Sequence, residues 1–128
     1  MYKIPLIPKN YYIELSEAND ALDEMINELN KKPISIKTLN TRVDTARDLV
    51  LKLYKSSTEI TKNACLAENM IVYANRFRVS SKIDDILQRA EKLFFEGKYK
   101  DALEIAVNVI SEFDQDIHKK IIEYVNNN

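Results

Sequence analysis

Residues 34–79 read ISIKTLNTRVDTARDLVLKLYKSSTEITKNACLAENMIVYANRFRV, a stretch without glycine or proline. Apolar residues recur in it in steps that alternate between three and four, and only Ser57 is polar: Ile36, Leu39, Val43, Ala46, Val50, Leu53, Ser57, Ile60, Ala64, Ala67, Ile71 and Ala74. This spacing puts the whole set, called the long seam below, on one helix face. It predicts one continuous helix over residues 36–77, roughly 60 Å long at ~1.5 Å per residue. The 3.5-residue period favours left-handed supercoiling with partner helices.

A shorter helix is predicted before the long one, over residues 10–30. Its apolar positions follow the same steps: Tyr11, Leu15, Ala18, Leu22, Met25 and Leu29. Its outer face is acidic: Glu14, Glu17, Asp20, Asp23, Glu24 and Glu28. Asn30 and Pro33 end this helix, and Ser35 is a plausible N-cap for the long one. Because the first helix is about half as long, we expect it to fold back antiparallel over the N-terminal half of the long helix.

The residues after Val79 are predicted to cover the other, alanine-rich half. Ser80 or Ser81 caps a helix that ends at Gly97, a second helix follows from Tyr99, and Asp114 or Asp116 caps a short last one. The positions Leu93, Phe94, Gly97, Tyr99, Ala102, Leu103 and Ala106 resemble one tetratricopeptide-type hairpin, with Tyr99 filling its corner. Arrays of such hairpins need about three copies. A packing role is therefore favoured over a peptide-binding groove.

These elements predict an all-α, elongated helical bundle around one long helix, as a single module over residues 1–128. Residues 1–9 form an extended lead-in, residues 10–78 an antiparallel helix pair, and residues 79–128 a closing helical hairpin with a short last helix. The composition agrees: there is one glycine, too few for a sheet protein or a phosphate-cradling loop. A hydrophobic content of 45% argues against disorder, and a net charge of −1 argues against a strongly basic nucleic-acid binder.

No residue pattern points to an enzyme, a metal or a cofactor. His118 is the only histidine and has no cysteine near it, so a solvated side chain is favoured over a ligand. Cys65 cannot form an internal disulfide, which indicates a thiol-reducing compartment. Asp84 and Asp85 point about 100° apart on a helix and suit a cap better than a paired acid–base site. The longest apolar run, residues 70–74, is far shorter than the ~20 residues of a membrane span, and no signal peptide is apparent.

The end of the long helix carries the best candidate for a binding surface. Tyr73, Asn75, Arg76 and Arg78 bring an aromatic ring, an amide and two guanidinium groups to one helix end. Arginine and aromatic residues are enriched at protein interfaces, and with Lys82 the arginines form a cluster that suits an acidic partner. The alternative is structural: the arginines complement the helix dipole, while Tyr73 and Phe77 pack inward.

The same residues carry a resemblance to a known family. Residues 63–78, NACLAENMIVYANRFR, are similar to the end of the septation ring formation regulator EzrA, where the pattern N-A-x-L-A-E is followed by I-Q-Y-G-N-R-Y-R. Residues 93–106 resemble that family's closing L-F…Y-x-x-A-L-E-x-A, and residues 7–11 and 29–34 resemble upstream segments. The resemblance covers essentially the whole chain in order.

The resemblance implies a C-terminal portion of a longer protein, with Met1 as an expression start. The family has an N-terminal membrane anchor and spectrin-like cytoplasmic repeats, and it regulates where FtsZ assembles into the division ring. FtsZ and other division proteins are thus the expected partners, and the cytoplasmic side of the membrane at the septum is the expected location. Asn75 and Arg76 match two positions of the family's Gln-Asn-Arg patch, whereas Val72 replaces its glutamine and Ala74 its glycine.

Two other kinds of binding protein stay open. One is a self-associating module, in which the alanine-rich half of the long seam pairs with a second copy of the chain. The other is a tetratricopeptide-like scaffold that holds a short peptide on the hairpin of residues 83–112, which contains Tyr99. Neither involves nucleic acid, a cofactor or membrane contact by these residues.

Overall fold

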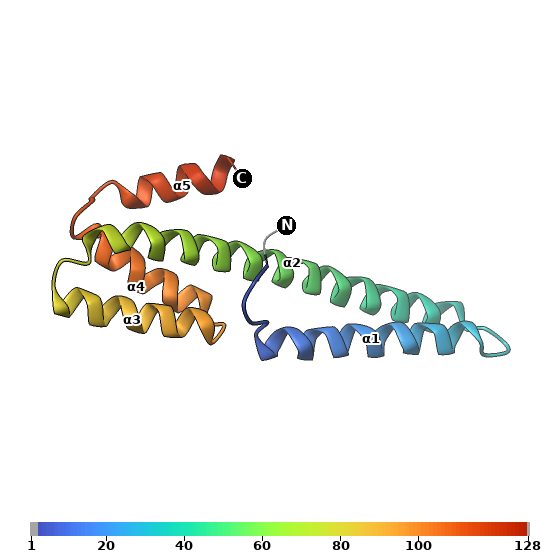
Figure 1. Ribbon diagram of the computed structural model, residues 1–128. Coiled ribbons are helices and arrows are strands. Elements are labelled where there is room, and N and C mark those ends of the chain that lie inside the picture. The colour runs from blue at the N-terminus through green and yellow to red at the C-terminus, as the bar shows by residue number, and fades with distance from the viewer. Residues whose placement is uncertain (1–2, 128) are drawn as a thin grey trace. The chain divides into compact units, whose positions relative to one another are not determined.

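The structure, a computed structural model that describes residues 3–127, is all-α within that range. Its elements are α1 (Lys9–Leu29), α2 (Ile36–Ala74), a 3-10 turn η1 (Asn75–Phe77), α3 (Ser81–Phe95), α4 (Tyr99–Ser111) and α5 (Ile117–Asn127) (Figure 1). The predicted all-α class and the long, uninterrupted helix are confirmed. The last turn of that helix tightens into η1 instead of remaining α-helical.

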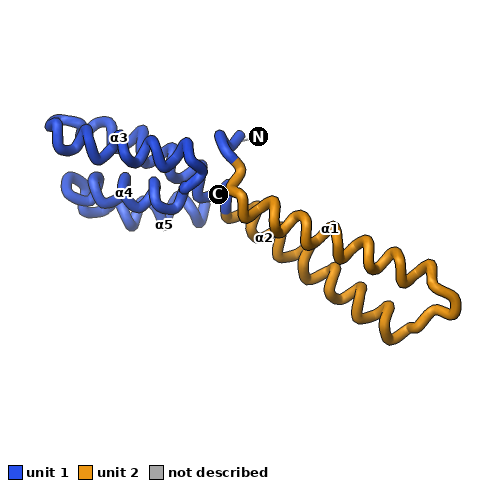
Figure 2. Tube along the Cα trace, turned by 90° about the horizontal axis from the view of Figure 1, so that it is seen from below, with its two compact units in different colours: residues 1–6, 60–128 blue, residues 7–59 orange. Residues whose placement is uncertain are grey.

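The chain divides into two compact units (Figure 2). Residues 7–59 form one, called the two-helix unit below, and residues 60–127 with the described lead-in residues 3–6 form the other, called the C-terminal unit. Because α2 contributes to both, its long seam has two different environments. The single module expected from the sequence stays a prediction.

In the two-helix unit, α1 runs antiparallel to the first part of α2 (Figures 1 and 2). The small residues Ala18 and Ala46 are buried, and Arg42 Nη1 donates to Glu24 Oε2 at 2.9 Å. Asn30 is the C-cap of α1, and Ser35 Oγ accepts a hydrogen bond from the backbone amide of Thr38. These are the predicted capping positions, and the fold-back of α1 over the N-terminal half of α2 is confirmed.

The core of the C-terminal unit is built on the alanine-rich half of the long seam. One buried cluster joins α2 to α3 and α4: Ala64, Ala67, Ile71, Ala90, Phe94, Tyr99, Ala102 and Ala106. A second joins α2 and α3 to α4 and α5: Ala74, Leu87, Val107, Val109, Ile110 and Ile117. Alanine at the crossing points lets the helices approach closely, and this half of the seam is covered within the chain itself.

The turn between α3 and α4 is a Schellman motif. The Lys98 amide donates to the Leu93 carbonyl at 2.9 Å, and the Gly97 amide donates to the Phe94 carbonyl at 3.1 Å. Gly97 has φ +84°, a left-handed conformation that glycine adopts without steric penalty. Sequence reasoning placed this glycine correctly as the residue that ends α3.

Tyr99 holds the lead-in by hydrogen bonds. The sequence alone did not reveal this contact. The Tyr99 hydroxyl accepts a hydrogen bond from the Leu6 amide at 3.0 Å and donates to the Leu6 carbonyl. Leu6 Cδ2 also lies 3.3 Å from the position that a Cβ on Gly97 would occupy, and Ile4 packs against the first cluster. Residues 3–8 lie outside any helix, and Leu6 is docked on the α3–α4 turn, whereas Lys9 of the predicted lead-in is the first residue of α1. Residues 1 and 2 of the predicted lead-in lie outside the described residues.

Candidate protein-binding surface at the end of α2

The candidate surface is built on the transition from α2 to α3. Ala74 is fully buried at the end of α2, and η1 begins at the next residue. The chain then leaves the helix through Arg78, and the extended Ser80 becomes the N-cap of α3, its Oγ accepting from the Ile83 amide at 3.2 Å. Asn75, Arg76 and Arg78 therefore sit on a short, tightly turned segment between two anchored helices.

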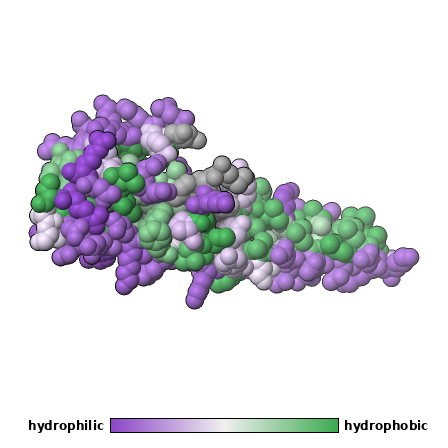
Figure 3. All heavy atoms as spheres, viewed as in Figure 1, coloured by the Kyte–Doolittle hydropathy of each residue, from purple (hydrophilic) through white to green (hydrophobic). Residues whose placement is uncertain are grey.

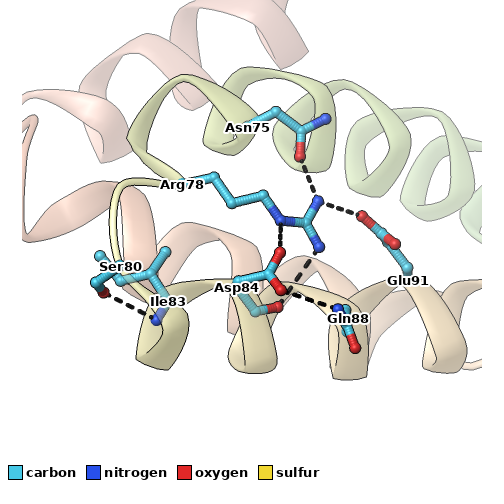
Figure 4. A network of polar contacts seen from close by, with 7 residues as sticks. All are labelled: Asn75, Arg78, Ser80, Ile83, Asp84, Gln88 and Glu91. Atoms are coloured by element: carbon cyan, nitrogen blue, oxygen red, sulfur yellow. Dashed lines mark hydrogen bonds and ion pairs between the residues drawn. The ribbon is translucent and has the colours of Figure 1, made fainter.

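Arg78 is engaged within the chain (Figure 4). Its Nη1 donates to Glu91 Oε1 at 2.8 Å and to Asn75 Oδ1 at 3.0 Å, and its Nε donates to the Asp84 carboxylate. The hydrogen bond that Arg78 donates to Glu91, and then the one that it donates to Asp84, raise the pKa of Arg78, against the opposing effect of burial. The side chain is 23% exposed, so this guanidinium holds η1 against α3 and offers little of its surface to a partner.

Asp84 belongs to the same network. Its carboxylate accepts from Gln88 Nε2 at 2.9 Å as well as from Arg78. Its neighbour Asp85 is exposed. The two carboxylates thus have different surroundings. The predicted capping role of Asp84 is wrong: Ser80 caps α3, and the Asp84 carboxylate accepts from the side chains of Arg78 and Gln88 instead.

Tyr73 contacts the loop between α4 and α5. Its hydroxyl donates to Asp114 Oδ2 at 2.9 Å, and Lys120 Nζ donates to the same oxygen at 2.6 Å. The hydrogen bonds from Lys120 and then Tyr73 lower the pKa of Asp114, and the bond with Asp114 raises the pKa of Lys120. The ring of Tyr73 consequently has a fixed orientation at the surface.

Four side chains make a continuous aromatic and cationic patch, which we call the Arg76 surface: Tyr73, Arg76, Phe77 and Phe113. The guanidinium carbon of Arg76 lies 5.2 Å from the centroid of the Tyr73 ring, a cation–π distance. Tyr73 meets Phe77 edge-on at 5.6 Å, and Phe77 stacks on Phe113 with ring centroids 4.8 Å apart. Arg76 and Phe113 are exposed, and Val72, one turn before Arg76, is 62% exposed.

The predicted residues therefore have two different environments. The structure brings Tyr73 and Arg76 together on the exposed patch, and it joins Asn75 to Arg78 in the network with α3. Sequence reasoning missed Phe113, Asp114 and Glu91, which complete these arrangements. No local pattern links them to Tyr73 or Arg78, because each comes from an element far along the chain. The recognition role of Tyr73, Asn75, Arg76 and Arg78 stays a prediction.

The other chemical candidates are placed as follows. Cys65 Sγ lies 3.6 Å from Tyr124 Oη, and Asn69 Nδ2 donates to that oxygen at 3.2 Å. The contact with the thiol raises the pKa of Tyr124. His118 is exposed on α5. Among residues 3–127, no three His, Cys, Asp or Glu side chains are grouped so that they could hold a metal ion. Across the same range, no helix combines the length and the apolar character needed to cross a membrane.

Comparisons with a family model and with curated proteins find the same family. The sequence model of the family described as "Septation ring formation regulator, EzrA" matches residues 1–125. The protein of that name from Geobacillus sp. (strain WCH70) is 31% identical over 113 residues, which cover 88% of this chain and 20% of the relative. The one from Bacillus subtilis (strain 168) is 30% identical over 110 residues, 85% of this chain and 20% of the relative. The one from Listeria monocytogenes serotype 4a (strain HCC23) is 27% identical over 121 residues, 93% and 21% respectively.

No solved structure matches the chain. The chain spans about a fifth of the length of the curated relatives that it matches. The family match runs across both compact units and includes every residue of the Arg76 surface. The chain belongs to the EzrA family of septation ring formation regulators.

Proposed function

We propose that this chain is a non-catalytic protein–protein interaction module of a cell-division regulator, and that it helps to control the assembly and placement of the FtsZ ring. Family membership supports a role in septation. The observation that carries the proposal is the Arg76 surface, where an exposed guanidinium and an exposed phenyl ring flank two further aromatic rings. Arginine and aromatic side chains are the residues that most often dominate binding energy at protein interfaces.

The chemistry of the surface favours an acidic partner segment that also carries an apolar side chain. Arg76 can form a charge-assisted hydrogen bond with a carboxylate, and Phe113 offers a flat apolar surface beside it. Arg78 acts as a positioning residue in this proposal, because its bonds to Glu91 and Asp84 hold η1 in place. Asn75 borders the surface, with its side-chain oxygen occupied by Arg78.

The proposal extends to the setting of the parent protein. We place the module on the cytoplasmic side of the cell membrane at the division septum, in a protein whose anchor lies outside this chain. The family resemblance is the support for this location and for FtsZ and other division proteins as partners. Two observations support a non-catalytic role: the family is one of regulators, and the Arg76 surface has the residues of a binding surface.

The two alternatives lose their obvious sites in this structure. Tyr99 is 3% exposed and its hydroxyl is occupied by Leu6, so the α3–α4 hairpin already holds an extended segment of its own chain. The alanine-rich half of the long seam is buried, with Ala64, Ala67 and Ala74 fully covered. Binding through the exposed Arg76 surface is therefore the function that we put forward.

Co-sedimentation with FtsZ polymers tests the proposal. The unmodified chain should pellet with the polymers, and Arg76→Glu should reduce that binding at least ten-fold. Arg89→Glu is the matched control, because Arg89 is an equally charged, exposed residue of the same unit on α3. Circular dichroism should show both variants folded.

Two results would contradict the proposal. Equal binding by Arg76→Glu and Arg89→Glu would exclude the Arg76 surface as the contact. If the unmodified chain stays in the supernatant, FtsZ is not a direct partner of these residues. Phe113→Ala provides a second variant, and it should also reduce binding, because the stack on Phe77 would lose its exposed ring.

A further inference from the structure

The lead-in lies on the α3–α4 turn in the way that a short peptide lies in a binding site. The Tyr99 hydroxyl accepts a hydrogen bond from the Leu6 amide at 3.0 Å and donates one to the Leu6 carbonyl. One side chain therefore binds both backbone groups of a single residue. Such hydrogen bonds require an extended backbone at this position and place no demand on the side chain.

Gly97 provides the space that the segment occupies. The three heavy atoms nearest to the position of a Cβ on Gly97 all belong to Leu6, and the first of them, Cδ2, is 3.3 Å away. The missing side chain thus allows the close approach of the segment. The Phe94 ring lies edge-on to the Tyr99 ring at 5.3 Å, and Ile4 packs against the buried cluster that contains both rings. We call Phe94, Gly97 and Tyr99 the Tyr99 site.

The sequence of the lead-in prepares it for binding in an extended conformation. Pro5 and Pro8 have φ fixed near about −65°, and they disfavour helical conformation at Ile4 and Ile7, which precede them. Pro8 has φ −58° and ψ 146°, which lies in the polyproline region. A segment that is extended before it binds loses less conformational entropy on docking, and proline-containing segments suit aromatic sites for this reason.

The docked lead-in leaves much of its own surface in solvent. Leu6 is 45% exposed and Ile7 is 38% exposed, and Figure 3 shows hydrophobic residues at the surface where the lead-in enters α1. Phe95, edge-on to Phe94 at 5.4 Å, is 67% exposed, so an aromatic ring next to the site is left largely uncovered. A segment held by so few contacts opens locally at a much lower free energy than the unit unfolds.

We propose that the Tyr99 site binds an extended, proline-flanked apolar segment of another protein, and that the lead-in is an internal ligand which such a segment displaces. The Tyr99 hydroxyl selects an extended backbone, and the contact at Gly97 selects an apolar side chain at the position of Leu6. The hairpin offers no free site in this structure because its internal ligand is bound. This inference does not rest on the proposed function, since it involves neither the Arg76 surface nor FtsZ.

Covalent attachment gives the lead-in an advantage over a free segment of the same sequence. A tethered ligand has an effective concentration of ~1 mM. For a free segment with a Kd of about 100 μM, the site is then open only about one-tenth of the time, and the apparent affinity is about ten-fold lower. Releasing the lead-in should remove this difference.

Fluorescence anisotropy with a labelled peptide of residues 3–8, KIPLIP, tests the proposal on the whole chain. Leu6→Asp puts a charge into the contact with Gly97 and should release the lead-in, so this variant should bind the peptide at least ten-fold more tightly than the unmodified chain. Leu29→Asp is the matched control, because Leu29 is 48% exposed and belongs to the two-helix unit. It should bind the peptide as the unmodified chain does, and circular dichroism should show both variants folded.

A second peptide tests the geometry without a change in the protein. Methylation of the Leu6 amide nitrogen in the peptide removes the donor to the Tyr99 hydroxyl, and it should weaken binding to the Leu6→Asp chain at least ten-fold.

Three results would overturn the proposal. If the Leu6→Asp chain does not bind the unmethylated peptide at about 1 mM, the site does not take a separate segment. Equal binding by the Leu6→Asp and unmodified chains would exclude the lead-in as an internal ligand. Equal binding of the two peptides would exclude recognition of the backbone by Tyr99.

Discussion

Arg78 Nη1 donates to Glu91 Oε1 at 2.8 Å, and this bond joins the turn after α2 to the body of α3. Arg76, two residues earlier, has its guanidinium over the Tyr73 ring at the surface. Arg76 and Arg78 look equivalent in the sequence, but they therefore have different roles. Arg78 stabilises the turn between α2 and α3, and Arg76 is available to a partner.

Replacing Arg78 should lower stability, whereas replacing Arg76 should not. Arg78→Gln removes the donor shared by Glu91, Asp84 and Asn75, and we expect a loss of about 1–2 kcal/mol. Thermal unfolding followed by circular dichroism should show a midpoint several degrees lower. Arg76→Gln serves as the control and should leave the midpoint unchanged. Equal midpoints for the two variants would refute the division of tasks.

The docked lead-in predicts a specific effect of Tyr99→Phe. The substitution keeps the buried ring but removes both hydrogen bonds to the Leu6 backbone. We expect a loss of about 1–2 kcal/mol and much faster hydrogen exchange at the Leu6 amide. Tyr12→Phe, on an exposed tyrosine of α1, should change neither quantity. Unaltered Leu6 exchange in Tyr99→Phe would argue against the docking.

Gly97 should tolerate asparagine better than alanine. With φ +84°, any side chain is strained there, and its Cβ would also press on Leu6 Cδ2 at 3.3 Å. Asparagine adopts left-handed conformations more readily than alanine does. Gly97→Ala should therefore cost about 1–2 kcal/mol, and Gly97→Asn less, in a comparison of denaturation midpoints. The reverse order would contradict this account of the turn.

The contact of Asp114 with Tyr73 and Lys120 predicts a pH dependence. The pKa of Asp114 is lowered in the folded chain. Its contribution to the free energy of unfolding is therefore complete above the unfolded pKa of 3.8, and it is lost as the pH falls below that value. The raised pKa of Lys120 has the opposite sign: its contribution is lost only as the pH rises above 10.5. Asp114→Asn should thus be less stable than the unmodified chain at pH 6, and the difference should shrink at pH 3. A constant difference in melting temperature at both pH values would contradict the assignment.

One buried carboxylate oxygen of the half-buried Glu14 in α1 offers a stabilising substitution. Glu14 Oε2 is buried and accepts no hydrogen bond from any residue in the described range. Because a buried polar atom without a partner is destabilising, Glu14→Leu should raise stability by about 1 kcal/mol. Glu17→Leu, on the exposed side of the same helix, should change it by less than ~0.5 kcal/mol. Urea denaturation monitored by circular dichroism compares the two.

Periodicity and capping residues predicted most of the secondary structure. The 3.5-residue spacing of the long seam located α2, and Asn30, Ser35, Ser80 and Gly97 act at the helix ends where their side chains or backbone freedom are needed. These signals are local: each depends on residues within about one helical turn.

The site could be predicted only in part, because its partners are distant in sequence. Glu91 is 13 residues from Arg78, and Asp114 is 41 residues from Tyr73. Before the helices are packed, nothing distinguishes these acids from the other acids of the chain. The same limit applies to Phe113, whose stacking on Phe77 requires the end of α4 to reach η1.

The bond between Leu6 and Tyr99 spans 93 positions of the chain, which has a consequence for biosynthesis. During translation the lead-in leaves the ribosome long before α4 exists, so Ile4 and Leu6 remain undocked in the nascent chain while α1 and α2 are being made. Closure of the C-terminal unit is thus a late event, and chains that terminate before Tyr99 are left with an undocked apolar segment that is open to proteases.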